Sequence, residues 1–130
     1  MTINDAIMNG ESAMANKKIV TALDFLFRDY RCSFSYEFDH GSRYLYDNGA
    51  FKVVIFHWEE FDDLDIHLVY NLQDYKIDPS FEEPKLLFEI KRKKKGIRGL
   101  FYDFEKDYWD VVARILKRKL QQIGIVEHRT

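Results

Sequence analysis

The segment His57–His67, HWEEFDDLDIH, places two histidines around five carboxylates. Its alternating side chains predict a β-hairpin whose loop is the three residues 60–62. In that register Phe56 lies opposite Ile66, and the large apolar side chains collect on one face. The predicted pairs are Trp58–Leu64, Phe56–Ile66 and Val54–Leu68.

The same register brings His57, Asp65 and His67 together on the other face. Two histidines and one carboxylate can hold a transition metal, so these three residues are the candidate ligands of a metal site. The competing interpretation is an ordinary cross-strand pair on the sheet surface. Because no HExxH motif or cysteine pair accompanies them, we favour the surface pair. We therefore predict no metal, no cofactor and no catalytic residue.

The turn of this hairpin is acidic and carries an aromatic residue at its tip. It lacks the central glycine and the closing glutamate of a calcium-binding EF-hand loop. Two interpretations remain open. The turn is either a solvated acidic loop or a contact surface, in which Phe61 anchors a partner and the carboxylates attract a basic one. The candidate partner-binding residues are Glu59, Glu60, Phe61, Asp62, Asp63 and Asp65.

A second charged segment, KRKKKGIRG at residues 91–99, is the most basic stretch of the chain. It either binds phosphate groups or forms a solvated loop after an edge strand, where lysines oppose aggregation. We favour the solvated loop, because the chain shows no RNP, KH or helix-turn-helix motif. Nucleic-acid recognition would call for aromatic side chains among the basic ones, or for basic residues carried on a helix. The residues of this alternative are Lys91, Arg92, Lys93, Lys94, Lys95 and Arg98.

The net charge of −2 hides a strong asymmetry along the chain. Residues 57–90 contain two basic and ten acidic residues, a net charge of −8. Residues 91–130 contain twelve basic and five acidic residues, a net charge of +7. This division indicates a charged partner, or two poles that face each other within one domain.

Hydrophobic periodicity predicts the elements that position these segments. Apolar residues three or four apart predict a helix that begins at Asn16. Strict alternation then predicts strands, separated by turns at residues 39–42 and 47–49. Two prolines, Pro79 and Pro84, interrupt the strands. The predicted strands are residues 33–38, a segment that begins at Tyr44, residues 51–58, residues 64–72, and a last strand with Leu86, Phe88 and Ile90.

A second helix closes the chain. Asp103 can cap its N-terminus, and Gly124 suits the position after its C-terminus. Each helix has one apolar stripe, so both should cover the same face of the sheet. The predicted fold class is therefore α+β: an N-terminal helix, an antiparallel meander of four to five strands and a C-terminal helix. Residues 1–15 are predicted to be a loose N-terminal arm, and residues 16–130 a single domain.

One face of the predicted strand at residues 51–58 is ambiguous. Val53 and Ile55 lie on the same side as His57, which makes that side too apolar for free solvent. Either the N-terminal arm partly covers a central strand there, or this face meets another molecule.

Composition limits the class of protein. The chain has 130 residues, 46% of them hydrophobic, so it can bury one core without disulfide bonds. Its single cysteine, Cys32, excludes an internal disulfide and is expected to be buried and inert. We expect no secretory signal, because the first residues lack a basic segment followed by an apolar one, and no membrane-spanning run. The cytoplasm is the expected compartment.

The layout resembles that of small stand-alone bacterial immunity and inhibitor proteins, although no family motif matches residue by residue. Together with the acidic hairpin, this resemblance implies a non-enzymatic module that binds another, basic protein. A homodimer stays open, and no membrane partner is expected. The first alternative is a nucleic-acid-associated protein that uses residues 91–98. The second is a small metal-dependent enzyme that uses His57, Asp65 and His67.

Overall fold

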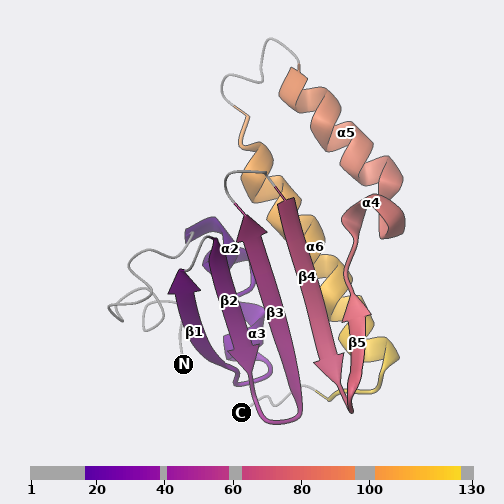
Figure 1. The fold of residues 1–130 in the computed structure, drawn as a ribbon. Helices are drawn as coiled ribbons and strands as arrows, with labels where there is room; N and C mark the ends of the chain where they lie inside the picture. Colours follow the sequence, from indigo (N-terminus) through magenta and orange to yellow (C-terminus); the bar gives the residue numbers. More distant parts are fainter. Residues whose placement is uncertain (1–16, 39–40, 59–62, 96–101, 127–130) are drawn as a thin grey trace.

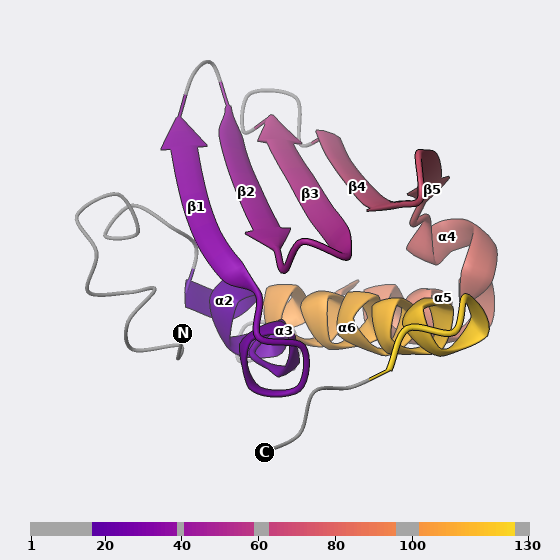
Figure 2. The same cartoon turned by 90° about the horizontal axis from the view of Figure 1, so that it is seen from below.

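The computed structural model describes residues 17–38, 41–58, 63–95 and 102–126. Within these ranges the chain forms a five-stranded antiparallel sheet with helices before and after it, which confirms the predicted α+β class. Figure 1 shows the sheet in front of the long C-terminal helix. Figure 2 shows the helices gathered in one layer against one face of the sheet.

The strands lie in the sheet in the same order as in the chain, so the predicted meander is confirmed. All neighbouring strands are antiparallel, as the short connections between them require. The strands are β1 Ser33–Phe38, β2 Ser42–Asp47, β3 Phe51–Trp58, β4 Asp63–Tyr70 and β5 Gln73–Lys76.

The predicted strand at residues 64–72 corresponds to β4, which ends at Tyr70, and the short strand β5 that follows was not predicted. The turn between them is formed by Asn71 and Leu72, whose φ angles are 50° and 66°. Positive φ at both central residues is the requirement of a type I′ hairpin turn, which usually contains asparagine and glycine. A leucine at the second position gives no turn signal, and for that reason the sequence pattern missed this hairpin.

The predicted N-terminal helix is present but divided into α2 Lys17–Ala22 and α3 Phe25–Arg28. The break does not interrupt its apolar stripe. Leu23, which lies in the break, is completely buried, as are Ile19 before it and Leu26 after it. Burial of this stripe against the core holds both short segments in place, since neither is long enough to be a stable helix alone.

The C-terminal helix is α6 Phe104–Gln122, and both of its predicted ends are confirmed. The Asp103 carboxylate accepts a hydrogen bond of 3.1 Å from the backbone N–H of Lys106, which caps the N-terminus. Gly124 has a φ of 83°, the left-handed conformation that commonly follows a helix. The described helices include none that is both long and apolar enough to cross a membrane.

Leu86, Phe88 and Ile90, predicted to alternate in a last strand, lie on a helix instead, so that prediction is wrong. Proline stops a strand, but it is equally suited to the first turn of a helix, and two helices begin at prolines here. Leu87 and Ile90, three residues apart, are the buried residues of this segment, whereas Phe88 is 65% exposed. The two helices are α4 Pro79–Glu82 and α5 Pro84–Lys95.

The predicted register between β3 and β4 is also wrong, by one residue. Phe56 lies opposite Asp65, and the two face away from the core. The predicted register turned Phe56 toward the core, and Lys52 with it, because residues four apart on a strand share a face. The observed register leaves Lys52 exposed. The observed pairs include Trp58–Asp63, Phe56–Asp65, Ile55–Ile66 and Val53–Leu68.

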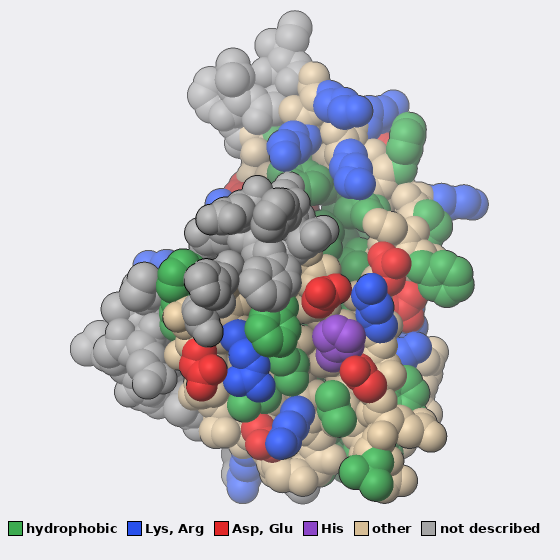
Figure 3. Space-filling view, viewed as in Figure 1, with side chains coloured by type: hydrophobic (Ala, Val, Ile, Leu, Met, Phe, Trp, Pro, Cys, Tyr) green, Lys and Arg blue, Asp and Glu red, His purple; other side chains and the backbone are tan. Residues whose placement is uncertain are grey.

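The face of the sheet that carries Phe56 has none of the described helices over it, and we call it the open face. Figure 3 looks onto this face and shows hydrophobic side chains mixed with side chains of both charges. Because alternate residues of a strand face the same side, the strand pairing shows which residues lie on this face. They include Arg43, Leu45, Lys52, Val54, Phe56, Asp65, His67, Val69, Asp74 and Lys76.

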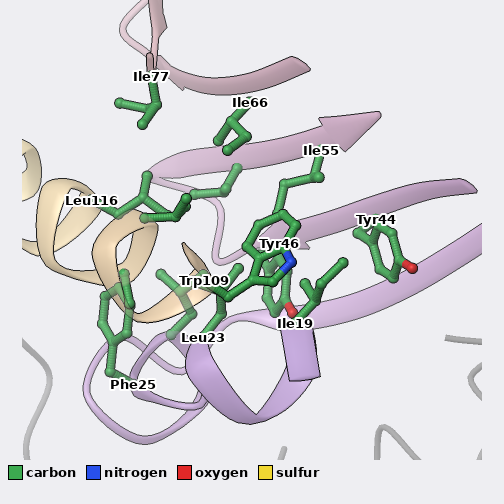
Figure 4. Packing of buried hydrophobic residues seen from close by; sticks show 14 of the residues in the cluster. Ile19, Leu23, Phe25, Tyr44, Tyr46, Ile55, Ile66, Ile77, Trp109 and Leu116 are labelled. Atoms are coloured by element: carbon green, nitrogen blue, oxygen red, sulfur yellow. The ribbon is translucent and has the colours of Figure 1, made fainter. Parts of the chain in front are cut away.

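The other face of the sheet forms the core together with α2 and α6. Figure 4 shows Ile55 and Ile66 pointing from the strands into a cluster that includes Trp109 and Leu116 of α6. Ile55 and Leu116 are completely buried. The ambiguous face of β3, with Val53 and Ile55, is therefore covered by the protein's own helices.

Candidate functional site

His57 and His67 lie on opposite faces of the sheet. His57 pairs with Leu64 and faces the helices, whereas His67 pairs with Val54 on the open face. Asp65 shares the open face with His67 and not with His57. The predicted cluster of these three residues is therefore wrong. The described part of the chain holds no group of three or more histidine, cysteine, aspartate or glutamate side chains that could bind a metal ion.

His67 forms a surface pair with the edge strand β5. Its Nδ1 atom lies 2.9 Å from Oδ1 of Asp74, and both side chains are partly exposed. Nearby, Nζ of Lys76 lies 3.8 Å from Oδ1 of Asp65. These are ordinary cross-strand pairs of a half-solvated sheet, each of small energetic value.

The centre of the open face is apolar. Leu45 lies opposite Val54, and Phe56 and Val69 occupy the adjoining rows of the same face. All four side chains are only half-buried. On β2, the Arg43 guanidinium lies 5.8 Å from the centre of the Phe56 ring. An apolar centre that remains partly accessible to solvent is typical of a protein-binding surface.

Charged side chains surround this centre, and most are already paired within the chain. Arg43 lies 3.5 Å from Glu37 of β1, and the two pairs that link β4 to β5 lie on the other side. A rim of charged side chains around an apolar centre is a common arrangement in protein interfaces. The open face therefore has the layout of an interface core with a polar rim.

The acidic segment joins β3, which ends at Trp58, to β4, which begins at Asp63. Glu59, Glu60, Phe61 and Asp62 lie outside the described residues, so their part in binding stays a prediction. Asp65 does lie on the open face, two residues after Asp63, the first residue of β4. The acidic segment and three residues of the apolar centre, Val54, Phe56 and Val69, thus belong to one continuous stretch of chain.

The basic run is carried by a helix, so its predicted place in a loop after an edge strand is wrong. Residues 91–95 form the last turns of α5, and all five side chains are exposed. Arg98 lies outside the described residues. Cations at the C-terminal end of a helix are stabilised by the helix dipole, which is one structural reason for this concentration of charge.

A groove of about 520 Å³ separates α5 from α6 and reaches the ends of β3 and β4. It combines residues of the histidine-flanked segment 57–67 with residues of the basic segment 91–99. Lysines from α5, aromatic residues from α6 and a histidine from β3 share its wall. The lining includes Lys91, Lys94, Phe104, Tyr108, Trp109 and His57.

Part of the acidic segment 57–90 contacts part of the basic segment 91–130 where α4 lies against α6. Glu83 accepts a hydrogen bond of 2.9 Å from Arg118 and lies 3.5 Å from Arg114. Glu82 lies 3.5 Å from Lys119. Several basic residues of α6 are therefore paired with carboxylates of the protein itself.

Cys32 is buried, as the sequence predicts, with 1% of its surface exposed. Burial raises the pKa of its thiol to about 12, and the neighbouring Asp47 carboxylate adds to the increase. Since the thiolate is the reactive form, this residue is a core side chain and not a nucleophile.

The residues that sequence reasoning missed are Leu45, Val54, Phe56 and Val69 on the open face. Lys52 carried the signal that would have found them. A lysine two residues before Val54 and four before Phe56 marks that side of the strand as the solvent side.

Comparison of the chain with protein-family models, with curated proteins and with solved structures finds no match in any of the three.

Proposed function

We propose that this protein is a binding module that takes another protein on the open face of its sheet, beside the acidic hairpin. It acts by binding and not by catalysis. The observation that supports this best is the half-buried apolar centre of Leu45, Val54, Phe56 and Val69 on a face without a described helix. A protein partner would complete the burial of these side chains, and apolar burial is a main driving force of association.

The charge of the neighbouring segment favours a basic partner. Residues 57–90 carry a net charge of −8, although ion pairs among the described residues engage five of their ten acidic residues. Asp65 adds negative charge to the open face, and the preceding residues 59–63 contain four more carboxylates in the sequence. Carboxylates at the rim of an interface speed the encounter with a positively charged protein more than they tighten the complex. A stand-alone inhibitor of a basic toxin or nuclease, as in bacterial immunity systems, is the sharpest form of this proposal.

Affinity capture with matched variants tests the proposal. The protein is immobilised and exposed to a nuclease-treated extract of its source cells, and bound proteins are identified by mass spectrometry. Phe56→Lys places a cation in the apolar centre, where Asp65 on the opposite strand can pair with it and preserve the fold. We expect this variant to retain the partner at least about tenfold less well than the wild type, as for an interface anchor.

Phe88→Lys is the matched control, because it makes the same substitution at an exposed phenylalanine on α5, outside the sheet. It should capture the same partner as the wild type. Equal capture by all three proteins would show that the open face is not the binding surface. Loss of the partner with Phe88→Lys alone would move the binding surface to α5.

A further inference from the structure

The groove between α5 and α6 joins cations to aromatic rings on the helical side of the molecule. Lys91 and Lys94 line it from α5, and Phe104 and Tyr108 from α6. Its volume of about 520 Å³ falls in the range of sites that hold small organic molecules. We propose that this groove and the basic end of α5 bind single-stranded nucleic acid, with one nucleotide in the groove and the adjoining phosphates on the lysines.

The cations of α5 are available to phosphates. Among the described residues, no carboxylate forms an ion pair with Lys91, Lys93, Lys94 or Lys95, whereas Arg92 pairs with Glu89 at 3.1 Å. All four of these lysines are exposed at one end of a single helix. Phosphates that neutralise such a cluster release counterions, which is the main source of sequence-independent affinity for nucleic acid.

Aromatic rings lie directly beside these lysines. Nζ of Lys94 lies 4.5 Å from the centre of the Phe104 ring, and Nζ of Lys93 lies 5.9 Å from that of Tyr102. The Phe104 and Tyr108 rings are 6.1 Å apart and inclined by 33°. A base that stacks on these partly exposed rings therefore keeps its phosphate within reach of a lysine, the arrangement of proteins that bind single strands.

A single strand fits this surface better than a duplex does. Stacking on a side chain needs an exposed base face, and a duplex hides those faces between its base pairs. Glu105 also lines the groove, but Lys18 lies 3.5 Å from its carboxylate and offsets its charge. The helix-borne cations and the neighbouring aromatic rings are the two features that the basic run lacked as a sequence pattern alone.

Fluorescence anisotropy with a labelled oligothymidylate of about ten nucleotides tests the proposal. At about 50 mM salt the wild type should bind, and the logarithm of its affinity should fall linearly with the logarithm of salt concentration. Lys91→Gln/Lys94→Gln should bind roughly tenfold more weakly with a shallower salt dependence. Tyr108→Ala should weaken binding about fivefold or more and leave the salt dependence unchanged, because stacking involves no counterions.

Lys52→Gln/Lys76→Gln is the matched control, because it removes two exposed lysines from the open face. Its affinity for the strand should equal that of the wild type. The proposal fails if the wild type does not bind at low salt, or if the control pair weakens binding as much as the groove pair. It fails also if a duplex of the same strand binds as tightly, since stacking would then play no part. Circular dichroism verifies that each variant is folded.

Discussion

His57 and His67 stand on opposite faces of the sheet, although their strands are neighbours. His57 lies opposite Leu64, and His67 lies opposite Val54. Because Val54 and His57 are three residues apart on β3, they face opposite sides of the sheet, and so do the two histidines. One residue of register decides whether two histidines meet or are divided by the sheet. Here they are divided, and the open face owes its character to apolar side chains instead.

A double-mutant cycle tests this separation. His57→Ala and His67→Ala should change the free energy of unfolding independently, because the two side chains lie on opposite faces of the sheet. The double variant should equal the sum of the single variants within about 0.5 kcal/mol, measured by urea unfolding. Zinc should stabilise the wild type no more than the double variant. A larger coupling energy, or stabilisation by zinc that requires both histidines, would restore the metal site.

The Asn71–Leu72 turn offers a second test. Leu72 has a φ of 66° and is fully exposed, so its side chain adds strain and contributes no packing. Leu72→Gly should raise the free energy of unfolding by about 0.5–1 kcal/mol, because glycine adopts positive φ without steric cost. Leu72→Ala, which keeps the β-carbon, is the control and should leave stability almost unchanged. A destabilised glycine variant would contradict the turn geometry.

The pKa of Cys32 leads to a prediction about reactivity and pH. Burial raises this pKa from 9.0 to about 12. Between these two pH values the folded protein keeps the protonated thiol, whereas the unfolded chain has the thiolate. This group therefore contributes stability that is complete below pH 9 and declines as pH rises toward 12. Iodoacetamide at about pH 8 should alkylate Cys32 slowly in the folded protein and quickly in guanidinium, as mass spectrometry can follow. Equal rates would mean that the thiol is accessible.

The sequence predicted those parts of the fold whose signals are local and unambiguous. Asp103 and Gly124 mark the ends of α6 by cap chemistry, and the alternation in β1 has no helical equivalent. The segment at residues 84–90 carried two signals at once. Its apolar residues fit both a strand and a helix, and Pro84 at its start is suited both to the end of a strand and to the first turn of a helix. Tertiary burial of Leu87 and Ile90 decided it in favour of a helix.

The candidate site depended on register, which is a non-local property. Within this hairpin the two faces of β4 were predicted correctly, because Ile66 and Leu68 alternate with Asp65 and His67. β3 has apolar residues on both sides. The prediction placed the large apolar side chain of Phe56 in the core and disregarded the charge of Lys52 on the same side. Val53 and Ile55 belong to the core cluster together with residues of α6, so the structure agrees with the one signal that Lys52 gives.

Site-specific photo-crosslinking tests the central claim, that a protein partner lies on the open face. A photoreactive phenylalanine analogue is placed at Leu45 or Val69 on that face, and at Phe88 on α5 for comparison. With the partner identified by affinity capture, irradiation should link it to positions 45 and 69 and leave position 88 unlinked, because only groups in contact with the analogue react. Crosslinks from position 88 with none from 45 or 69 would contradict the account.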